Sequence, residues 1–195
     1  MFIELTDHLR CPSDHDEQFL VLLPDRIEGR SVRSGQLGCP VCGRVFHLAD
    51  GVFDAGDAPP VGAEASALTG DALGALVGLH GPGGYLVVAG APAAMAEDIA
   101  ELFPGVALVA MNPPADVADG DLVSVLRGGM LPLKARSMRG VVLGAPFGED
   151  PHWVGEAARV VLPGLRVVGE GTDPAAEEIE VLASAGGVWV ATPRR

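Results

Sequence analysis

The chain has 195 residues, 48% of them apolar, and a formal net charge of −13 at pH 7. This length suffices for one ordinary domain plus a small one, and the apolar content suffices for a sizeable core. The negative charge excludes a protein that wraps nucleic acid, because that function needs clustered cations. No apolar run reaches the length of a membrane span, and residues 1–10 lack a signal-peptide core, so we expect a soluble, cytosolic protein.

Residues 1–56 are expected to form a small first unit. Residues 2–9 indicate a short helix or turn. Two strands are predicted over residues 19–23 and 26–32, with a turn at Pro24-Asp25 between them. Further short strands are predicted at residues 45–48 and 52–53. The first unit is therefore expected to be rich in β-structure.

Cysteine spacing in this unit predicts a metal site. Cys39 and Cys42 stand in a C-P-V-C-G turn, which is typical of a zinc knuckle. A structural zinc ion needs four ligands, and Cys11 supplies a third. Asp14 stands at the C-x-x-C spacing from Cys11, and His15 follows it. Because zinc accepts imidazole in structural sites more readily than carboxylate, we predict Cys11, His15, Cys39 and Cys42 as the ligands of a zinc ion.

Three motifs in the first unit carry a family resemblance: L-R-C-P at residues 9–12, G-C-P-V-C-G-R at residues 38–44 and F-H-L-A-D-G-V at residues 46–52. The unit resembles the small zinc-ribbon proteins that activate tRNA, rRNA and release-factor methyltransferases. It departs from that family at Asp14, where the family has a cysteine. The alternative is a ribbon that has lost its metal and is held together by apolar side chains.

The rest of the chain is predicted to be a linker followed by a larger domain. Residues 57–63 are rich in Gly, Pro and Ala and indicate a linker, and residues 64–195 indicate the domain. Strands are predicted over residues 85–89, 106–110, 121–126, 141–143, 165–168 and 187–191. Helices are predicted over residues 64–79, from Pro92 to about residue 100, and over residues 151–162 and 174–184. This alternation favours an α/β fold with a doubly wound, mostly parallel, Rossmann-like sheet.

The stretch from residue 83 to residue 100 organises this domain. A buried strand ends at Gly90, and Pro92 opens a helix immediately afterwards. In doubly wound folds the ligand lies on such a turn, where free N–H groups of the helix face outward.

Two later segments carry a second resemblance, S-M-R-G-V-V-L at residues 137–143 and W-V-G-E-A-A-R-V-V-L-P-G-L-R-V-V-G at residues 153–169. Together with residues 83–100 they resemble class I S-adenosylmethionine-dependent methyltransferases over residues 64–195. The resemblance implies a binding site for S-adenosylmethionine at the first turn.

The cofactor residues implied by this resemblance are largely missing. Val88, Met111 and Arg127 stand where the family carries its acidic residues. Gly90 and Asn112 are the vestigial cofactor-binding positions that remain. The other departures are Pro92, Ala94 and Arg139. We therefore expect no catalytic residue and no tight binding of S-adenosylmethionine.

One cluster of cations indicates a docking surface. Half of the second domain's eight cations lie within thirteen residues, at Arg127, Lys134, Arg136 and Arg139. By fold, this loop is expected at the carboxyl edge of the sheet, over the empty crevice. An acidic protein partner or lipid head groups would suit it. The alternative is a solvated loop.

As a whole, the sequence predicts a zinc-ribbon module fused to a degenerate methyltransferase domain. We expect a non-catalytic accessory or scaffolding subunit of a larger protein assembly, cytoplasmic or peripheral on a membrane complex. One alternative is an active S-adenosylmethionine-dependent methyltransferase with its activator fused in cis. The other is a regulatory module that binds another small ligand in the crevice.

Overall fold

The computed structural model of the chain describes residues 1–59, 65–174 and 176–194. Its strands are β1 (Val21–Glu28), β2 (Ser31–Gly38), β3 (Val45–Ala49), β4 (Val52–Asp54), β5 (Tyr85–Ala89), β6 (Ala107–Met111), β7 (Val123–Arg127), β8 (Gly140–Leu143), β9 (Val167–Glu170), β10 (Ile179–Ala185) and β11 (Val188–Pro193). Its helices are the 3-10 helices η1 (Ile3–His8) and η2 (Ala91–Met95) and the α-helices α1 (Gly70–Val77), α2 (Ala96–Leu102) and α3 (Pro151–Val160).

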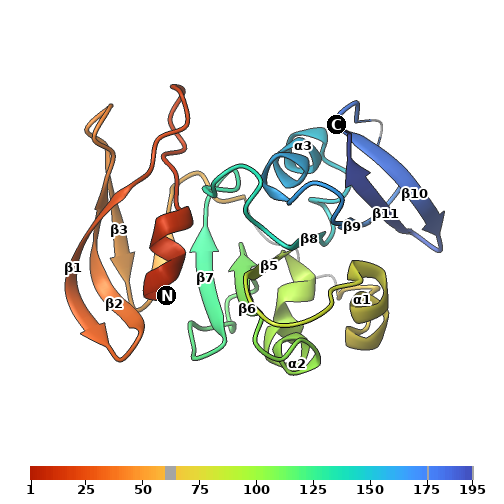
Figure 1. Ribbon diagram of the computed structural model, residues 1–195, viewed down its shortest axis with the longest axis horizontal. Coiled ribbons are helices and arrows are strands. Elements are labelled where there is room, and N and C mark those ends of the chain that lie inside the picture. The colour runs from red at the N-terminus through yellow and green to blue at the C-terminus, as the bar shows by residue number, and fades with distance from the viewer. Residues whose placement is uncertain (60–64, 175, 195) are drawn as a thin grey trace.

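The described strands form one continuous sheet in the order β1-β2-β3-β4-β7-β6-β5-β8-β9-β11-β10 (Figure 1). The five strands from β7 to β9 in this order run parallel, as does the β4–β7 pair. Strands β1 to β4 at one end and β9, β11 and β10 at the other pair antiparallel. The α/β prediction is confirmed, but the sheet is mixed rather than mostly parallel.

The first unit departs from the prediction at its first hairpin. β1 runs through Pro24 and Asp25 with an irregular register there, and the chain reverses only at Gly29. Gly29 adopts φ 58°, a backbone conformation that glycine takes without steric cost. Pro24 is accommodated because β1 is an edge strand, which needs no donor on its free side. The expected short helix at the start of the chain is η1.

The second unit departs most clearly near its end. Residues 174–184 were expected to be helical, yet Ile179–Ala185 forms β10, which pairs with β11. Gly186 (φ 61°) and Gly187 (φ 77°) form the intervening turn, and two glycines with positive φ suit a tight hairpin. This Gly-Gly pair is the sequence signal that the helix prediction overlooked.

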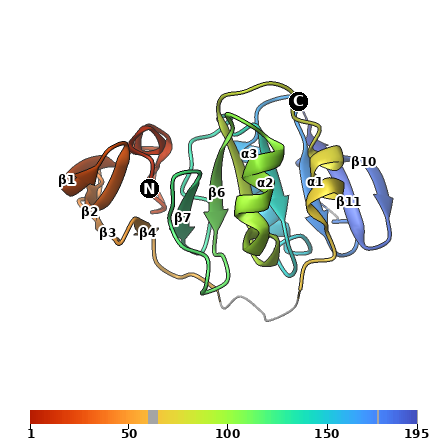
Figure 2. The same cartoon turned by 90° about the horizontal axis from the view of Figure 1, so that it is seen from below.

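Helices cover both faces of the sheet, as a doubly wound fold requires. Alternate residues of β5 divide between the two cores: Leu86 and Val88 pack with α1 and α2, and Val87 packs with α3. Figure 2 shows α1 and α2 on the near face and α3 behind the sheet. α1 is shorter than the predicted helix. Thr69 is its N-cap residue, and the Thr69 hydroxyl accepts from the N–H of Ala72.

The two expected domains share a sheet and a core. β4 pairs with β7 in parallel, with Phe53 opposite Leu126. The buried side chains of Met1, Leu5 and Leu9 join the same apolar cluster as Val87 in β5. The predicted linker at residues 57–63 falls partly outside the described residues. Within the described ranges, every helix is too short or too polar to cross a membrane.

Candidate metal centre and closed crevice

Two loops of the first unit bring together the four residues predicted as metal ligands. The ligand atoms of Cys11, His15, Cys39 and Cys42 all lie within 4.8 Å of one another. The Sγ atoms of Cys11 and Cys42 are 3.7 Å apart, and Cys39 Sγ lies 3.4 Å from His15 Nε2. A tetrahedral zinc ion with Zn–S bonds of about 2.3 Å separates its sulfur ligands by about 3.8 Å. The group therefore fits zinc, and it contains the imidazole of His15 rather than the carboxylate of Asp14.

The surroundings of His15 favour its role as a ligand. Its Nδ1 lies 2.7 Å from the carbonyl oxygen of Asp16. Because a carbonyl oxygen can only accept a hydrogen bond, Nδ1 must carry the proton and donate it. This hydrogen bond leaves the Nε2 lone pair directed at the sulfur atoms, as is usual for metal-bound histidine. In the metal-free chain, the Asp16 carbonyl and the neighbouring sulfur atoms raise the pKa of His15 to about 9. Metal binding would replace that proton.

The second knuckle favours thiolates. The Cys39 carbonyl accepts from the N–H of Gly43 at 3.0 Å, and Gly43 adopts φ 71°, which closes the turn. The backbone N–H of Arg44 is the largest cause that lowers the pKa of Cys42 to about 6. Burial acts in the opposite direction on Cys11 and raises the pKa of its thiol.

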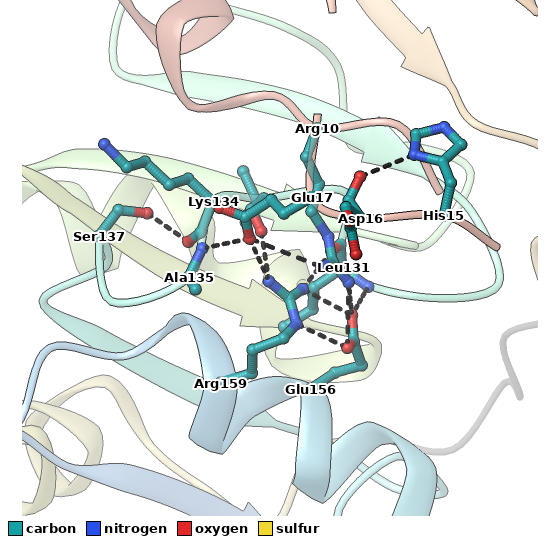
Figure 3. Close-up of polar contacts among 11 residues, drawn as sticks. Arg10, His15, Asp16, Glu17, Leu131, Lys134, Ala135, Ser137, Glu156 and Arg159 are labelled. Atoms are coloured by element: carbon teal, nitrogen blue, oxygen red, sulfur yellow. Dashed lines mark hydrogen bonds and ion pairs between the residues drawn. The ribbon is translucent and has the colours of Figure 1, made fainter. Parts of the chain in front are cut away.

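An ion-pair network connects the first knuckle, residues 10–17, to the sheet domain (Figure 3). Glu156 of α3, a nearly buried side chain, accepts from Nε and Nη2 of Arg159, both at 2.8 Å. It also accepts from Nη2 of Arg10 at 3.3 Å and from the N–H of Leu131 at 3.2 Å. Because Arg10 precedes the candidate metal ligand Cys11, the network joins the first knuckle to α3.

The predicted cation cluster is divided between the carboxyl ends and the amino ends of the parallel strands. Arg127 ends β7, whereas Arg139 immediately precedes β8, and these two strands run in the same direction. Arg139 donates to the carbonyl oxygens of residues 80, 81, 82 and 83 at 2.6–3.1 Å. The expectation of one patch over the crevice was therefore wrong, because Arg139 holds the chain at the opposite edge.

The segment between these two arginines packs against the chain's own first unit. Leu131 and Leu133 are fully buried, and Leu133 pairs with Leu9. The Lys134 ammonium group lies 5.4 Å from the centre of the Phe19 ring. Leu131 and Leu133 are thus used inside the chain and cannot anchor a partner, while Lys134 and Arg136 remain exposed.

The crevice at the topological switch point is closed by apolar side chains. Strand order reverses between β5 and β8, and doubly wound folds bind ligands outside the carboxyl ends of such strands. There the ring of Phe147, which is 1% exposed, lies against Gly90, leaving no room for a Cβ atom. Pro92 lies against Gly144 in the same way and occupies the space that a Cβ atom of residue 144 would need. Gly90 is itself buried, and the Phe147 ring fills the space on the side where a side chain of residue 90 would project.

Two buried polar side chains at this edge are already engaged within the chain. Asn112 is 1% exposed; its amide group donates to the carbonyl of Gly128 and accepts from the Gly128 N–H, at 2.8 and 2.9 Å. Glu170, which the sequence analysis missed, is buried at the end of β9. It accepts from the N–H groups of Ala67 and Ala145 at 2.7 and 3.1 Å. The signal for Glu170 was an acidic residue directly after an apolar strand.

A scan against protein-family models and a search of curated proteins both found no match. Solved structures similar to the chain include the geranyl diphosphate C-methyltransferase of Streptomyces coelicolor A3(2), at 21% identity and a TM-score of 0.44, covering 51% of this chain and 43% of that one. A complex of the Haloferax volcanii Trm112 methyltransferase activator matches at 24% identity and a TM-score of 0.38, covering 45% of each chain. The antibiotic-resistance methyltransferase Kmr matches at 11% identity and a TM-score of 0.44, covering 69% of this chain and 98% of that one.

The chain thus spans less than half the length of the first methyltransferases it matches.

Proposed function

We propose that the chain is a zinc-stabilised, non-catalytic accessory subunit built on a methyltransferase-like fold. The observation that carries this proposal is the closure of the switch-point crevice by Phe147 and Pro92. S-adenosylmethionine would need backbone contact at Gly90, and the Phe147 ring occupies that approach.

The charges at the same edge also disfavour a cofactor. The strands β5, β6 and β7 end in Ala89, Met111 and Arg127, whose side chains cannot accept a hydrogen bond from a ribose hydroxyl or from the adenine amine as a carboxylate would. One charge-assisted hydrogen bond contributes about 1.5–3 kcal/mol, so the loss of several acceptors removes most of the affinity.

The proposed zinc ion has a structural role. Four protein ligands complete a tetrahedral site and leave no position for a substrate or a reactive water. The ion would hold residues 11–15 against residues 39–42, which in turn supports the Arg10–Glu156 contact with α3.

The outer surface of the first unit supports an accessory role. Four apolar side chains are between 52% and 65% exposed there, namely Val21, Leu23, Val41 and Val45. Exposed apolar groups of this kind suit contact with a protein partner. Lys134 and Arg136 form a second, polar candidate for the same contact, as the sequence proposed.

Isothermal titration calorimetry with S-adenosylmethionine and S-adenosylhomocysteine tests the proposal. We expect no binding tighter than about 1 mM, with an active methyltransferase as the positive control in the same buffer. A micromolar dissociation constant for the purified chain would overturn the proposal and favour the alternative, an active methyltransferase with its activator in cis. Phe147→Ala provides a second arm, because affinity that appears only in this variant would identify the ring as the block.

A further inference from the structure

A cavity of about 750 Å³ opens at the edge of the sheet opposite the closed crevice. It is lined by the amino ends of β5, β6 and β7 and by the first unit around η1 and the β1–β2 turn. The arrowheads of β5 and β7 point up in Figure 1, so this edge lies below them, near the N-terminus. The volume falls within the range of small-molecule sites, about 300–1,000 Å³.

Tyr85 places an unused polar group in the wall of this cavity. The residue is only 9% exposed and lines the cavity, yet its hydroxyl has no hydrogen-bond partner among the described residues. Its ring packs against His8, with the centroids 5.2 Å apart. The hydroxyl oxygen is not among the solvent-shielded polar atoms that lack a partner, so it is open to the cavity and free to take a hydrogen-bond partner there. A ligand in the cavity would supply one.

The charges around the cavity favour a cation. Four carboxylates and two guanidinium groups line it. Arg30 pairs with Glu4 at 2.7 Å, and Arg33 pairs with Glu28 at 3.0 Å. Glu101 and Asp121 make no ion pair within the part of the chain that the structure describes, so two negative charges remain.

The same surroundings shift the pKa of Tyr85. Burial, followed by the charge of Glu4, raises the pKa of Tyr85 to about 12. The phenol therefore stays neutral at physiological pH and can donate or accept a hydrogen bond.

The rest of the wall is apolar. Phe2 from the first unit and Leu122 from the sheet domain both line the cavity, and Leu122 is 51% exposed. An apolar ligand body would cover these side chains and gain roughly 25 cal/mol per Å² of buried apolar surface.

We propose that this cavity binds a small protonated amine with an aromatic or aliphatic body. Glu101 and Asp121 would pair with the ammonium group, Phe2 and Leu122 would contact the body, and the Tyr85 hydroxyl would bond a polar atom of the ligand. Because both units line the site, the ligand bridges them. This inference is independent of the proposed function, since the two sites lie at opposite edges of the sheet.

Calorimetry of the full chain with tryptamine as the probe tests the site. Neutral tryptophol and anionic indole-3-propionate carry the same ring and serve as matched ligands. We expect saturable binding of tryptamine, at least about tenfold tighter than either control and weaker at high salt. Equal affinity for the three ligands, or no saturable binding of tryptamine at millimolar concentration, would overturn the proposal.

Two double variants test whether tryptamine binds in this cavity. Glu101→Gln combined with Asp121→Asn should weaken tryptamine binding by at least about tenfold, because both ion pairs are lost. Both side chains are exposed, so the fold should tolerate the change. Glu97→Gln combined with Asp98→Asn removes the same charge from exposed positions of α2 and should leave the affinity unchanged. Unaltered affinity in the first double variant, or NMR shifts centred on Ala145 instead of Tyr85, would contradict the assignment.

Discussion

Glu170 carries a buried carboxylate at the carboxyl end of β9, and four donors from other parts of the chain saturate it. They are the Ser66 hydroxyl and the backbone N–H groups of Ala67, Leu68 and Ala145, at 2.6–3.1 Å. A carboxylate bound in this way is held by the protein itself and is not available to a ligand. Glu170 thus fastens the segment before α1 to the loop after β8.

Arg139 and Asn112 behave in the same way. Each is a polar side chain beside a strand end, where the sequence suggested a contact with a partner or a cofactor. In the fold, the Arg139 guanidinium group bonds four backbone carbonyls, and the Asn112 amide group closes on Gly128. Their hydrogen-bonding capacity is satisfied by loops that lack regular structure and need such partners.

His8 makes the stability of the chain depend on pH. Its ring is half-buried against Tyr85, and burial, followed by the charge of Lys134, lowers its pKa below the ordinary value of 6.5. The folded chain therefore binds fewer protons than the unfolded chain between those two pKa values. Consequently the free energy of unfolding should fall as the pH drops through about 6.5 and level off below the folded-state pKa.

Urea unfolding of wild type and His8→Phe at pH 7.5 and pH 5 measures this effect. Phe keeps the ring contact with Tyr85 and removes the titrating group, so the variant should lose less stability on acidification than wild type. His47→Phe, at an exposed position of β3, should keep the wild-type dependence. If His8→Phe shows the wild-type pH dependence, His8 does not contribute to it.

At the scale of elements, the candidate metal centre forms where the loop after η1 meets the loop after β2. Neither loop holds more than two of the four ligands, so the site exists only when both are in place. Gly43 allows the second knuckle to turn, and the Arg10–Glu156 contact positions the first.

We expect purified protein to contain about one zinc ion per chain. His15→Ala should reduce the zinc content to below about a tenth of an equivalent, because an ion with three remaining ligands is held weakly. Asp14→Ala is the matched control and should keep its zinc. Elemental analysis of the three proteins checks the prediction. Well-folded wild type without zinc would refute it, and zinc loss in Asp14→Ala alone would move the fourth ligand to Asp14.

The connections between the parallel strands determine which face each element covers. The segments from β6 to β7 and from β7 to β8 contain no helix, although a doubly wound sheet usually has one at each crossover. In their place, η1 and the buried Leu131 and Leu133 cover this part of the sheet. The first unit therefore supplies a layer that the second unit lacks.

At the scale of the whole molecule, this shared layer predicts that the chain unfolds as one unit. Met1, Leu5 and Leu9 are 0% exposed and belong to the cluster that also contains Trp153 and Trp189. Separating the units would expose that apolar surface, at a cost of roughly 25 cal/mol per Å². Cooperative loss of both units is therefore the expected behaviour.

Two probes report on the two units. Both tryptophans lie in the second unit, and zinc release, followed with a chromophoric chelator, reports on the first. We expect the two transitions to coincide on urea unfolding. Prior removal of zinc with EDTA should lower the tryptophan midpoint, and added zinc should restore it. A tryptophan transition that is unaffected by EDTA would show that the units unfold independently.

The sequence by itself determined the parts of this protein that depend on local patterns. The buried strand at Tyr85–Ala89, its turn at Gly90 and the helix at Pro151 follow from apolar runs and from Gly and Pro positions. The four residues that gather at the metal centre also followed, because ligand spacing in two short loops is a local property.

Only the tertiary structure decided how distant segments meet. The β10 strand was mistaken for a helix because its pairing with β11 outweighs the helix propensity of its sequence. A local pattern could mark Glu170, but it could not place the donors that bind it. Nor could it place the carbonyl partners of Arg139, the Phe147 ring beside Gly90 or the cavity beside Tyr85. Each depends on contacts between residues more than 20 positions apart, and such contacts are set by packing and by the donors and acceptors that burial leaves without water.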